Sequence, residues 1–90
     1  MKRNNIINRT LKVIRTTVDI SAYYSKDGGI YVFDNKLRIY VDDEFDIVFY
    51  EETHFKGTWY DNETEVKCIA KILQYVFNYY CQKELYNAID

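Results

Sequence analysis

Residues 37–51 read LRIYVDDEFDIVFYE, and this stretch decides the fold. Its apolar residues recur with a period of two in both halves: Leu37, Ile39 and Val41, then Phe45, Ile47 and Phe49. Such alternation is typical of strands that bury one face. The acidic run Asp42-Asp43-Glu44 separates the halves and predicts a turn. The stretch therefore predicts an antiparallel hairpin with one apolar face.

Further strand signals lie on both sides of this hairpin. Residues 20–25 and 30–33 predict two earlier strands, joined at residues 26–29 by a turn whose glycines supply positive φ. Asp34 and Asn35 tolerate a left-handed backbone and predict the next hairpin turn. Residues 55–60 (FKGTWY) form either a fifth short strand or an ordered loop. The sequence thus predicts a meander of four or five antiparallel strands.

Helical patterns flank the meander. Residues 4–18 place Ile7, Leu11 and Ile14 on one face, and residues 63–87 contain neither Gly nor Pro. We therefore predict a single α+β domain over residues 1–90, in which an N-terminal helix and a long C-terminal helix pack on one face of the sheet.

The C-terminal helix carries more apolar surface than one sheet needs to cover it. Its main predicted face comprises Val66, Ile69, Ala70, Leu73, Val76, Phe77 and Tyr80. Beside that face runs a second stripe of Cys68, Ile72, Tyr75, Tyr79 and Tyr86. Because exposed aromatic area commonly marks an interaction site, we interpret Ile72, Tyr75, Tyr79 and Tyr86 as a homodimer contact.

Charge is distributed unevenly along the chain. Residues 1–18 contain five basic side chains and no acid, whereas residues 41–65 contain nine acids and one lysine. A dense negative surface can steer a basic partner toward it, and it repels nucleic-acid phosphates. The same acids could equally protect a strand from aggregation. As a partner-binding surface, the acidic strip would consist of Asp42, Asp43, Glu44, Asp46, Glu51 and Glu52, with Tyr50 and Trp59 as apolar anchors. Trp59 is equally suited to closing the core between the sheet and the final helix.

Composition suggests a source for such a protein. Tyr, Phe, Ile, Asn and Lys, whose codons are AT-rich, supply 40 of the 90 residues. In size, AT-rich composition and acidic strip, the chain resembles the small acidic proteins with which phages and mobile elements block host defence, such as anti-CRISPR or anti-restriction proteins. We therefore expect a non-enzymatic inhibitor that mimics phosphates and occupies the basic groove of a nucleic-acid-binding protein.

An alternative hypothesis uses the opposite end of the chain. Lys2, Arg3, Arg9, Lys12 and Arg15 could hold nucleic acid, with sheet tyrosines stacking on the bases. The sheet residues considered for this role are Tyr23, Tyr24, Tyr31, Phe33 and Tyr40. The chain lacks the RNP-type pattern, in which a basic residue precedes Gly, an aromatic residue, a small residue and an aromatic residue. We therefore expect the acidic protein to bind nucleic acid less readily than protein.

No residue pattern indicates catalysis. His54 is the single histidine, and one histidine with scattered carboxylates does not make a metal site, so we expect no metal, cofactor or catalytic residue. Cys68 and Cys81 are 13 residues apart, about 20 Å along one helix, too far for a disulfide. Without a signal peptide or a membrane-spanning run, the sequence predicts a cytoplasmic protein.

Overall fold

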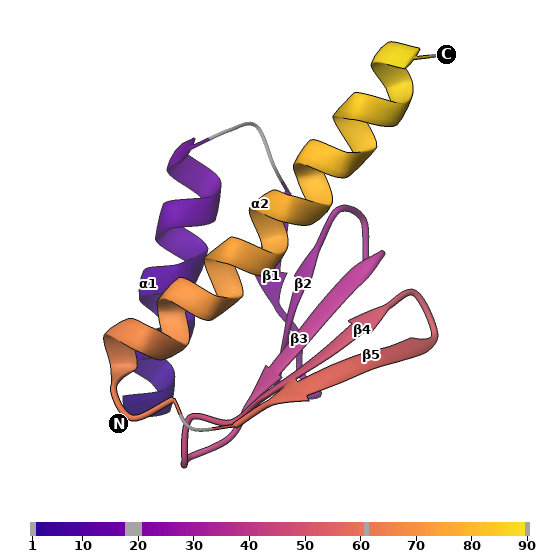
Figure 1. The fold of residues 1–90 in the computed structure, drawn as a ribbon. Helices are drawn as coiled ribbons and strands as arrows, with labels where there is room; N and C mark the ends of the chain where they lie inside the picture. Colours follow the sequence, from indigo (N-terminus) through magenta and orange to yellow (C-terminus); the bar gives the residue numbers. More distant parts are fainter. Residues whose placement is uncertain (1, 18–20, 61, 90) are drawn as a thin grey trace.

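A computed structural model describes residues 2–17, 21–60 and 62–89, and the side chains within 3–16, 21–60 and 62–85. The elements in chain order are α1 (Lys2–Thr17), β1 (Ala22–Tyr24), β2 (Gly29–Val32), β3 (Leu37–Val41), β4 (Ile47–Glu51), β5 (His54–Trp59) and α2 (Glu65–Ile89). The predicted α+β fold is confirmed (Figure 1). Of the two alternatives for residues 55–60, the strand is correct.

The five strands form one sheet in chain order, β1-β2-β3-β4-β5, and every neighbouring pair is antiparallel. The central hairpin pairs Ile39 with Phe49 and Val41 with Ile47. Because successive side chains on a strand face opposite ways, this register puts all four on one side of the sheet. β1 and β5 form the two outer edges.

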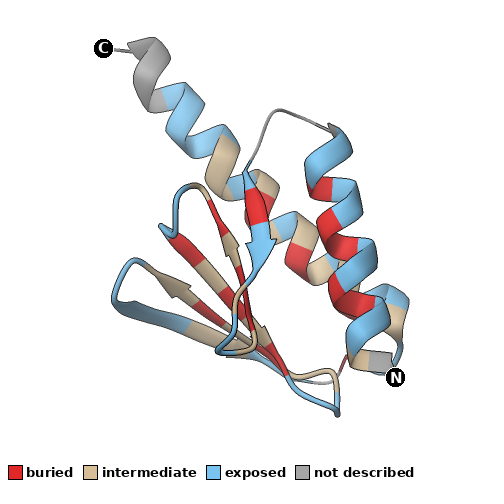
Figure 2. Cartoon of the chain, turned by 180° about the vertical axis from the view of Figure 1, so that it is seen from behind, coloured by how far each residue is buried: buried red, intermediate tan, exposed pale blue. Residues whose placement is uncertain are grey.

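Both helices lie on the same side of the sheet, as predicted, and the core fills the space between the two layers (Figures 1 and 2). The sheet contributes buried Ala22, Ile30, Val32, Leu37, Ile39, Val41, Ile47 and Phe49. The helices contribute Ile6, Ile7, Leu11, Ile14, Cys68, Ile72 and Val76. Helix α1 follows the predicted spacing of three and four residues, so one of its faces is buried and the other is solvated.

Contacts within the chain occupy much of the predicted homodimer stripe on α2. Ile72 is fully buried, so including it in an exposed contact was wrong. Tyr75 and Tyr79 are half-buried: Tyr75 stacks on Phe49, and Tyr79 packs against Phe33 with ring centroids 5.1 Å apart. A homodimer contact through these two tyrosines stays a prediction. The side chain of Tyr86 lies outside the described residues. Because α2 packs against α1 as well as the sheet, it buries an apolar surface wider than one sheet can cover.

The main apolar face predicted for α2 was also displaced around the helix axis. Val66 is 66% exposed and Ala70 is exposed, whereas Cys68 is fully buried. The stripe that includes Cys68 and Ile72 therefore faces the centre of the core, and the predicted main face lies partly in solvent.

The fourth strand begins two residues later than predicted, at Ile47 rather than Phe45. Phe45 has a φ of 66°, a left-handed conformation that a bulky residue seldom adopts. The Asp42 carboxylate stabilises this turn, since its Oδ1 accepts the N–H groups of Glu44 at 2.8 Å and Asp46 at 3.0 Å. The Phe45 side chain still packs against the core.

Candidate functional site

The face of the sheet opposite the helices carries aromatic side chains in register across all five strands. Tyr23 pairs with Tyr31, Tyr31 with Arg38, Arg38 with Tyr50, and Tyr50 with Phe55. A second, shorter row pairs Tyr40 with Val48. We call these seven residues the open face: Tyr23, Tyr31, Arg38, Tyr40, Val48, Tyr50 and Phe55. A solvent-facing side of a sheet normally carries small polar or charged residues, so five exposed or half-buried aromatic rings here are unusual.

A hydrogen-bond network centred on one carboxylate fixes two tyrosines of this face. Asp27 Oδ2 accepts the hydroxyl groups of Tyr31 and Tyr40, the latter at 2.8 Å, and Oδ1 accepts the Gly29 N–H at 3.1 Å. The Tyr40 ring lies over Gly29, where a Cβ would be 2.8 Å from the ring carbon Cε1. A side chain at position 29 would therefore displace Tyr40.

Arg38 is held at the centre of the open face. Its guanidinium carbon lies 4.9 Å from the centroid of the Tyr50 ring, and its Nη2 donates to the Glu52 carbonyl oxygen at 2.9 Å. Tyr50 also contacts the rings of Tyr40 and Phe55 edge to face. A shallow cavity of about 350 Å³ is lined by Arg38, Tyr40, Val48 and Tyr50. The open face is thus preorganised, with one cation among aromatic rings.

The electrostatics of this network fix the protonation states of Asp27 and Tyr40 at neutral pH. The hydrogen bond from Tyr31 is the largest influence on the pKa of Asp27, and with those from Tyr40 and Gly29 it lowers that pKa against the opposing effect of desolvation, so Asp27 stays ionised at neutral pH. Burial, followed by hydrogen bonds to Tyr31 and Asp27, raises the pKa of Tyr40 above its ordinary value of 10. Tyr40 therefore stays protonated and is a poor nucleophile or base at neutral pH.

The structure divides the predicted acidic strip into two groups. Asp42, Asp43, Glu44 and Asp46 lie at or beside the β3–β4 turn, whereas Glu51 and Glu52 lie at the β4–β5 turn. Four residues of β4 lie between Asp46 and Glu51, and the five residue steps from one to the other span about 17 Å. Glu51 faces the helices, where its carboxylate accepts the Tyr75 hydroxyl and pairs with Lys56. Tyr50, on the other side of the strand, belongs to the open face.

The first acidic group is joined by Glu63, which lies just before α2, and by Glu65, the first residue of α2. Asn62 Nδ2 donates to the Phe45 carbonyl oxygen at 2.8 Å and holds the segment before α2 against the β3–β4 turn. This contact brings Glu63 and Glu65 to the same end of the molecule. We call Asp42, Asp43, Glu44, Asp46, Glu63 and Glu65 the acidic end. Lys67 and Arg9 partly neutralise it through ion pairs with Glu63 at 3.1 Å and Glu65 at 3.8 Å.

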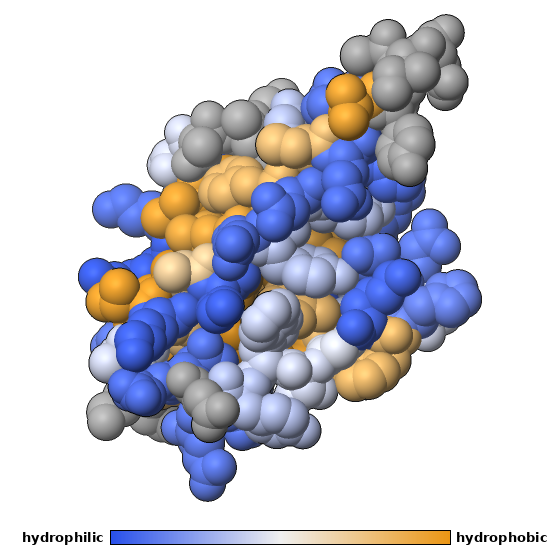
Figure 3. Space-filling model, in the orientation of Figure 1, coloured by the Kyte–Doolittle hydropathy of each residue, from blue (hydrophilic) through white to orange (hydrophobic). Residues whose placement is uncertain are grey.

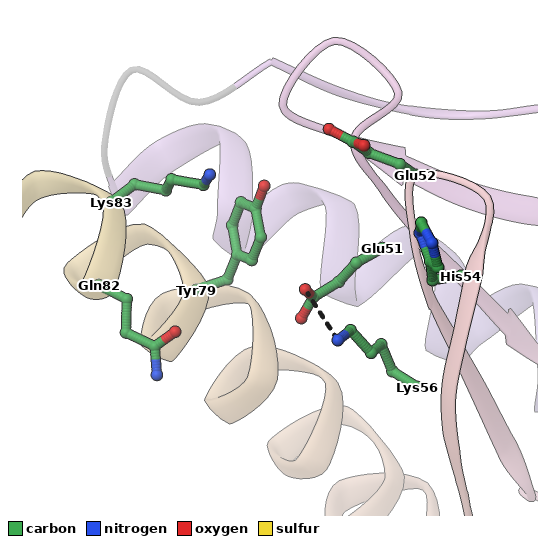
Figure 4. Close-up of a pocket in the computed structure, with 7 residues that line it drawn as sticks. All are labelled: Glu51, Glu52, His54, Lys56, Tyr79, Gln82 and Lys83. Carbon is green, nitrogen blue, oxygen red and sulfur yellow. Dashed lines mark ion pairs between the residues drawn. The ribbon is translucent and has the colours of Figure 1, made fainter. Parts of the chain in front are cut away.

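Trp59 does not close the core between the sheet and α2. It lies in β5, is 45% exposed, and has the Lys71 ammonium 4.4 Å from its ring centroid. With α2 it borders a groove on the helix side of β5. Figure 4 shows the other end of this groove, where Glu51 and Lys56 extend from the sheet toward Tyr79 of α2. His54 lines the same end.

The basic helix is less available for nucleic acid than its sequence indicates. Arg3 donates to the Gly28 carbonyl oxygen, Arg15 donates to that of Ala22 at 2.9 Å, and Arg9 pairs with Glu65. The side chain of Lys2 lies outside the described residues. Of the five cations predicted to bind nucleic acid, three are used in contacts within the fold.

Sequence reasoning identified only part of the open face. Tyr23, Tyr31 and Tyr40 were grouped correctly, but Tyr24 and Phe33 lie elsewhere: Tyr24 pairs with buried Ile30, and Phe33 packs against Tyr79 and Tyr80. The hydrogen-bonding centre Asp27 and the edge residue Phe55 were missed. The sequence signal for this surface was the alternation of Arg38 and Tyr40 with buried residues. The register of β4 and β5 was also needed, because it shows which residues lie beside Arg38 and Tyr40.

The part of the chain that the structure describes contains no helix suited to crossing a membrane. Within the same residues, no three His, Cys, Asp or Glu side chains are grouped so that they could hold a metal ion. Comparison of the chain with protein families, curated proteins and solved structures finds no match.

Proposed function

We propose that this chain is a non-enzymatic binding protein whose open face contacts a protein partner. The supporting observation is the cross-strand row Tyr23, Tyr31, Arg38, Tyr50 and Phe55 on the side of the sheet away from the helices. Tyr and Arg are the residue types enriched in the energetically dominant parts of protein interfaces. The Asp27 network supports this role because it fixes Tyr31 and Tyr40 before binding, which lowers the entropy lost on association.

The charge of the open face favours protein over nucleic acid. Arg38 is its single cation, and the exposed carboxylate of Asp27, hydrogen-bonded to Tyr31 and Tyr40, offsets that charge. A nucleic acid strand brings a phosphate with every nucleotide, and each needs neutralising. A protein patch with apolar side chains and one carboxylate for Arg38 fits better.

The size of the open face sets the kind of partnership. Five strands about 4.8 Å apart and about 17 Å long give roughly 400 Å² of sheet surface. A standard stable interface takes about 800 Å² from each partner. The open face by itself therefore suits a transient partner, or one that also contacts neighbouring turns.

Photo-crosslinking tests this proposal, since it captures transient partners. Benzoylphenylalanine at Phe55, which is 60% exposed on the open face, should crosslink a discrete protein in a lysate of the source organism. The same group at Val66, 66% exposed on α2, is the matched control and should not. Arg38→Glu should abolish the capture at position 55. Equal capture from both positions, or none from position 55, would sink the proposal.

A second proposal retains the acidic inhibitor, now confined to the acidic end. It is supported by the Asn62 contact, which gathers carboxylates from the β3–β4 turn and from α2 at one end of the molecule. These carboxylates would mimic phosphates in the basic groove of a nucleic-acid-processing or defence complex. Benzoylphenylalanine at Glu44, which is exposed in the β3–β4 turn, should then crosslink a protein, and Asp43→Lys with Asp46→Lys should abolish that capture. Capture through the open face, from position 55, should survive the double substitution.

A further inference from the structure

The groove between β5 and α2 is a second feature of the molecule, on the opposite side of β5 from the open face. Three cavities of about 300, 160 and 440 Å³ lie along it. The last two share Trp59, Lys71 and Gln74, so they are continuous. Figure 3 shows hydrophilic side chains following α2 diagonally across this side of the molecule.

Four lysines line the groove, and two of them have no carboxylate partner. Lys56 pairs with Glu51, and Lys67 with Glu63. Among the described residues Lys71 and Lys83 form no ion pair; their ammonium groups lie over the rings of Trp59 and Tyr79, at 4.4 and 5.4 Å. Each ammonium group can form an ion pair with a ligand carboxylate, and the lysine alkyl chain and the ring beneath it shield that ion pair from water.

The floor and edge of the groove suit an extended chain. β5 is an outer strand of the sheet. Its residues Gly57–Trp59 pair regularly with β4, and the register shifts at Lys56. An edge strand presents N–H and C=O groups outward to an added strand. On the opposite wall Gln74, Asn78 and Gln82 follow one another at intervals of four residues, about 6 Å. Their amides can donate to and accept from a peptide backbone.

We propose that this groove binds an extended peptide segment carrying two carboxylates about six residues apart. Lys71 and Lys83 are 12 residues apart on α2, about 18 Å, and six residues of extended chain cover about 20 Å with both carboxylates on the same face. A single nucleic acid strand fits less well, because it brings a phosphate with every nucleotide, whereas only two of the four lysines are without an ion pair among the described residues.

The single tryptophan of the chain provides the measurement. The capped peptide ESTSTSE should change Trp59 emission saturably at low salt, whereas KSTSTSK should not. Shortening the separation of the glutamates to two residues should weaken binding about tenfold, since only one lysine can then be reached. Lys71→Gln with Lys83→Gln should weaken the binding of ESTSTSE by at least about tenfold.

Lys12→Gln with Lys36→Gln is the matched control, because it removes two exposed lysines elsewhere. It should leave the affinity within about twofold, and circular dichroism should show both variants folded. The proposal is overturned if ESTSTSE does not bind, if the control variant loses as much affinity, or if an eight-nucleotide oligothymidylate binds more tightly than the peptide. None of these readouts involves the open face, so this proposal and the proposed function fail independently.

Discussion

Tyr75 donates its hydroxyl group to Glu51 Oε1 at 2.7 Å while its ring stacks on Phe49, with ring centroids 4.1 Å apart. One side chain of α2 thus joins the helix to β4 through both a charged hydrogen bond and aromatic packing. The two contributions can be separated, because phenylalanine keeps the ring and removes the hydroxyl.

Tyr75→Phe should lower the free energy of unfolding by about 1 to 2 kcal/mol, the loss expected for a hydrogen bond to a charged acceptor. Urea unfolding followed by circular dichroism measures it. Tyr79→Phe is the control, since among the described residues the Tyr79 hydroxyl makes no hydrogen bond. A loss in Tyr79→Phe equal to that in Tyr75→Phe would contradict the assigned role.

The same contact has a consequence at alkaline pH. Burial, and then the hydrogen bond and charge of Glu51, raise the pKa of Tyr75 above its ordinary value of 10. Its contribution to stability is therefore complete below pH 10 and is lost as the pH rises further, because the unfolded state ionises first. Between pH 9 and 11 the melting temperature should fall less steeply in Tyr75→Phe than in the parent chain.

Asp27→Asn should alter the acid side of the stability profile. Hydrogen bonds lower the pKa of Asp27 from its ordinary 3.8, so its contribution is present above that value and is lost as the pH falls below it. Melting temperatures between pH 2 and 6 should depend less on pH in the variant. Asp34→Asn, at an exposed turn position, is the comparison, and it should leave the pH dependence closer to that of the parent.

Gly29→Ala should distort the open face although none of its seven residues is replaced. The added Cβ would lie 2.8 and 3.0 Å from two atoms of the Tyr40 ring, so the ring must move and its hydrogen bond to Asp27 must lengthen. We expect a loss of about 1 to 3 kcal/mol. Gly57→Ala is instructive, since a Cβ there meets nothing within 4 Å and any cost reflects only its φ of 154°. A smaller loss at position 29 than at position 57 would be inconsistent with this packing.

Thr10→Val should stabilise the protein. The Thr10 side chain is fully buried in α1, and its hydroxyl has no hydrogen-bond partner among the described residues. Replacing it by an isosteric methyl group removes an unsatisfied polar atom, worth about 1 kcal/mol. Thr10→Ser keeps the hydroxyl and loses the methyl group, so it should destabilise. Equal unfolding midpoints for the two variants would refute the interpretation.

The two cysteines should react very differently with a thiol reagent. Cys81 is exposed, whereas Cys68 is buried, and burial, with the nearby charges of Asp42 and Asp46, raises its pKa to about 11. At pH 8 the thiolate fraction of Cys68 is then about one in a thousand. Ellman's reagent should titrate one thiol in the folded protein and two in denaturant. Two thiols in the folded protein would show that the core around Cys68 opens readily.

The period of two predicted the strands well, because both signals that fix a hairpin, apolar alternation and turn chemistry, are local. It predicted the side of the sheet on which Ile39, Ile47 and Phe49 lie. The face of α2 could not be predicted this way. Its neighbours are α1 and the sheet together, and a one-dimensional pattern does not indicate which of two apolar stripes lies between them. The open face required the register that places Arg38 opposite Tyr50.

The structure divides the acidic strip for a related reason. Residues close in sequence can lie on opposite sides of a sheet, as Tyr50 and Glu51 do, or beyond opposite ends of one strand, as Asp46 and Glu52 do. Conversely, Glu63 and Glu65 were brought to the β3–β4 turn by the Asn62 contact, which no spacing rule anticipates.

Two consecutive residues of β4, whose side chains point to opposite sides of the sheet, join the open face to the groove. Tyr50 belongs to the open face, and Glu51, one peptide bond away, lines the groove and pairs with Lys56. Strand β4 is thus a common wall of the open face and the groove. A change that a ligand at one of these proposed sites imposed on this strand would reach the other, and thermodynamic linkage would make the effect equal in both directions.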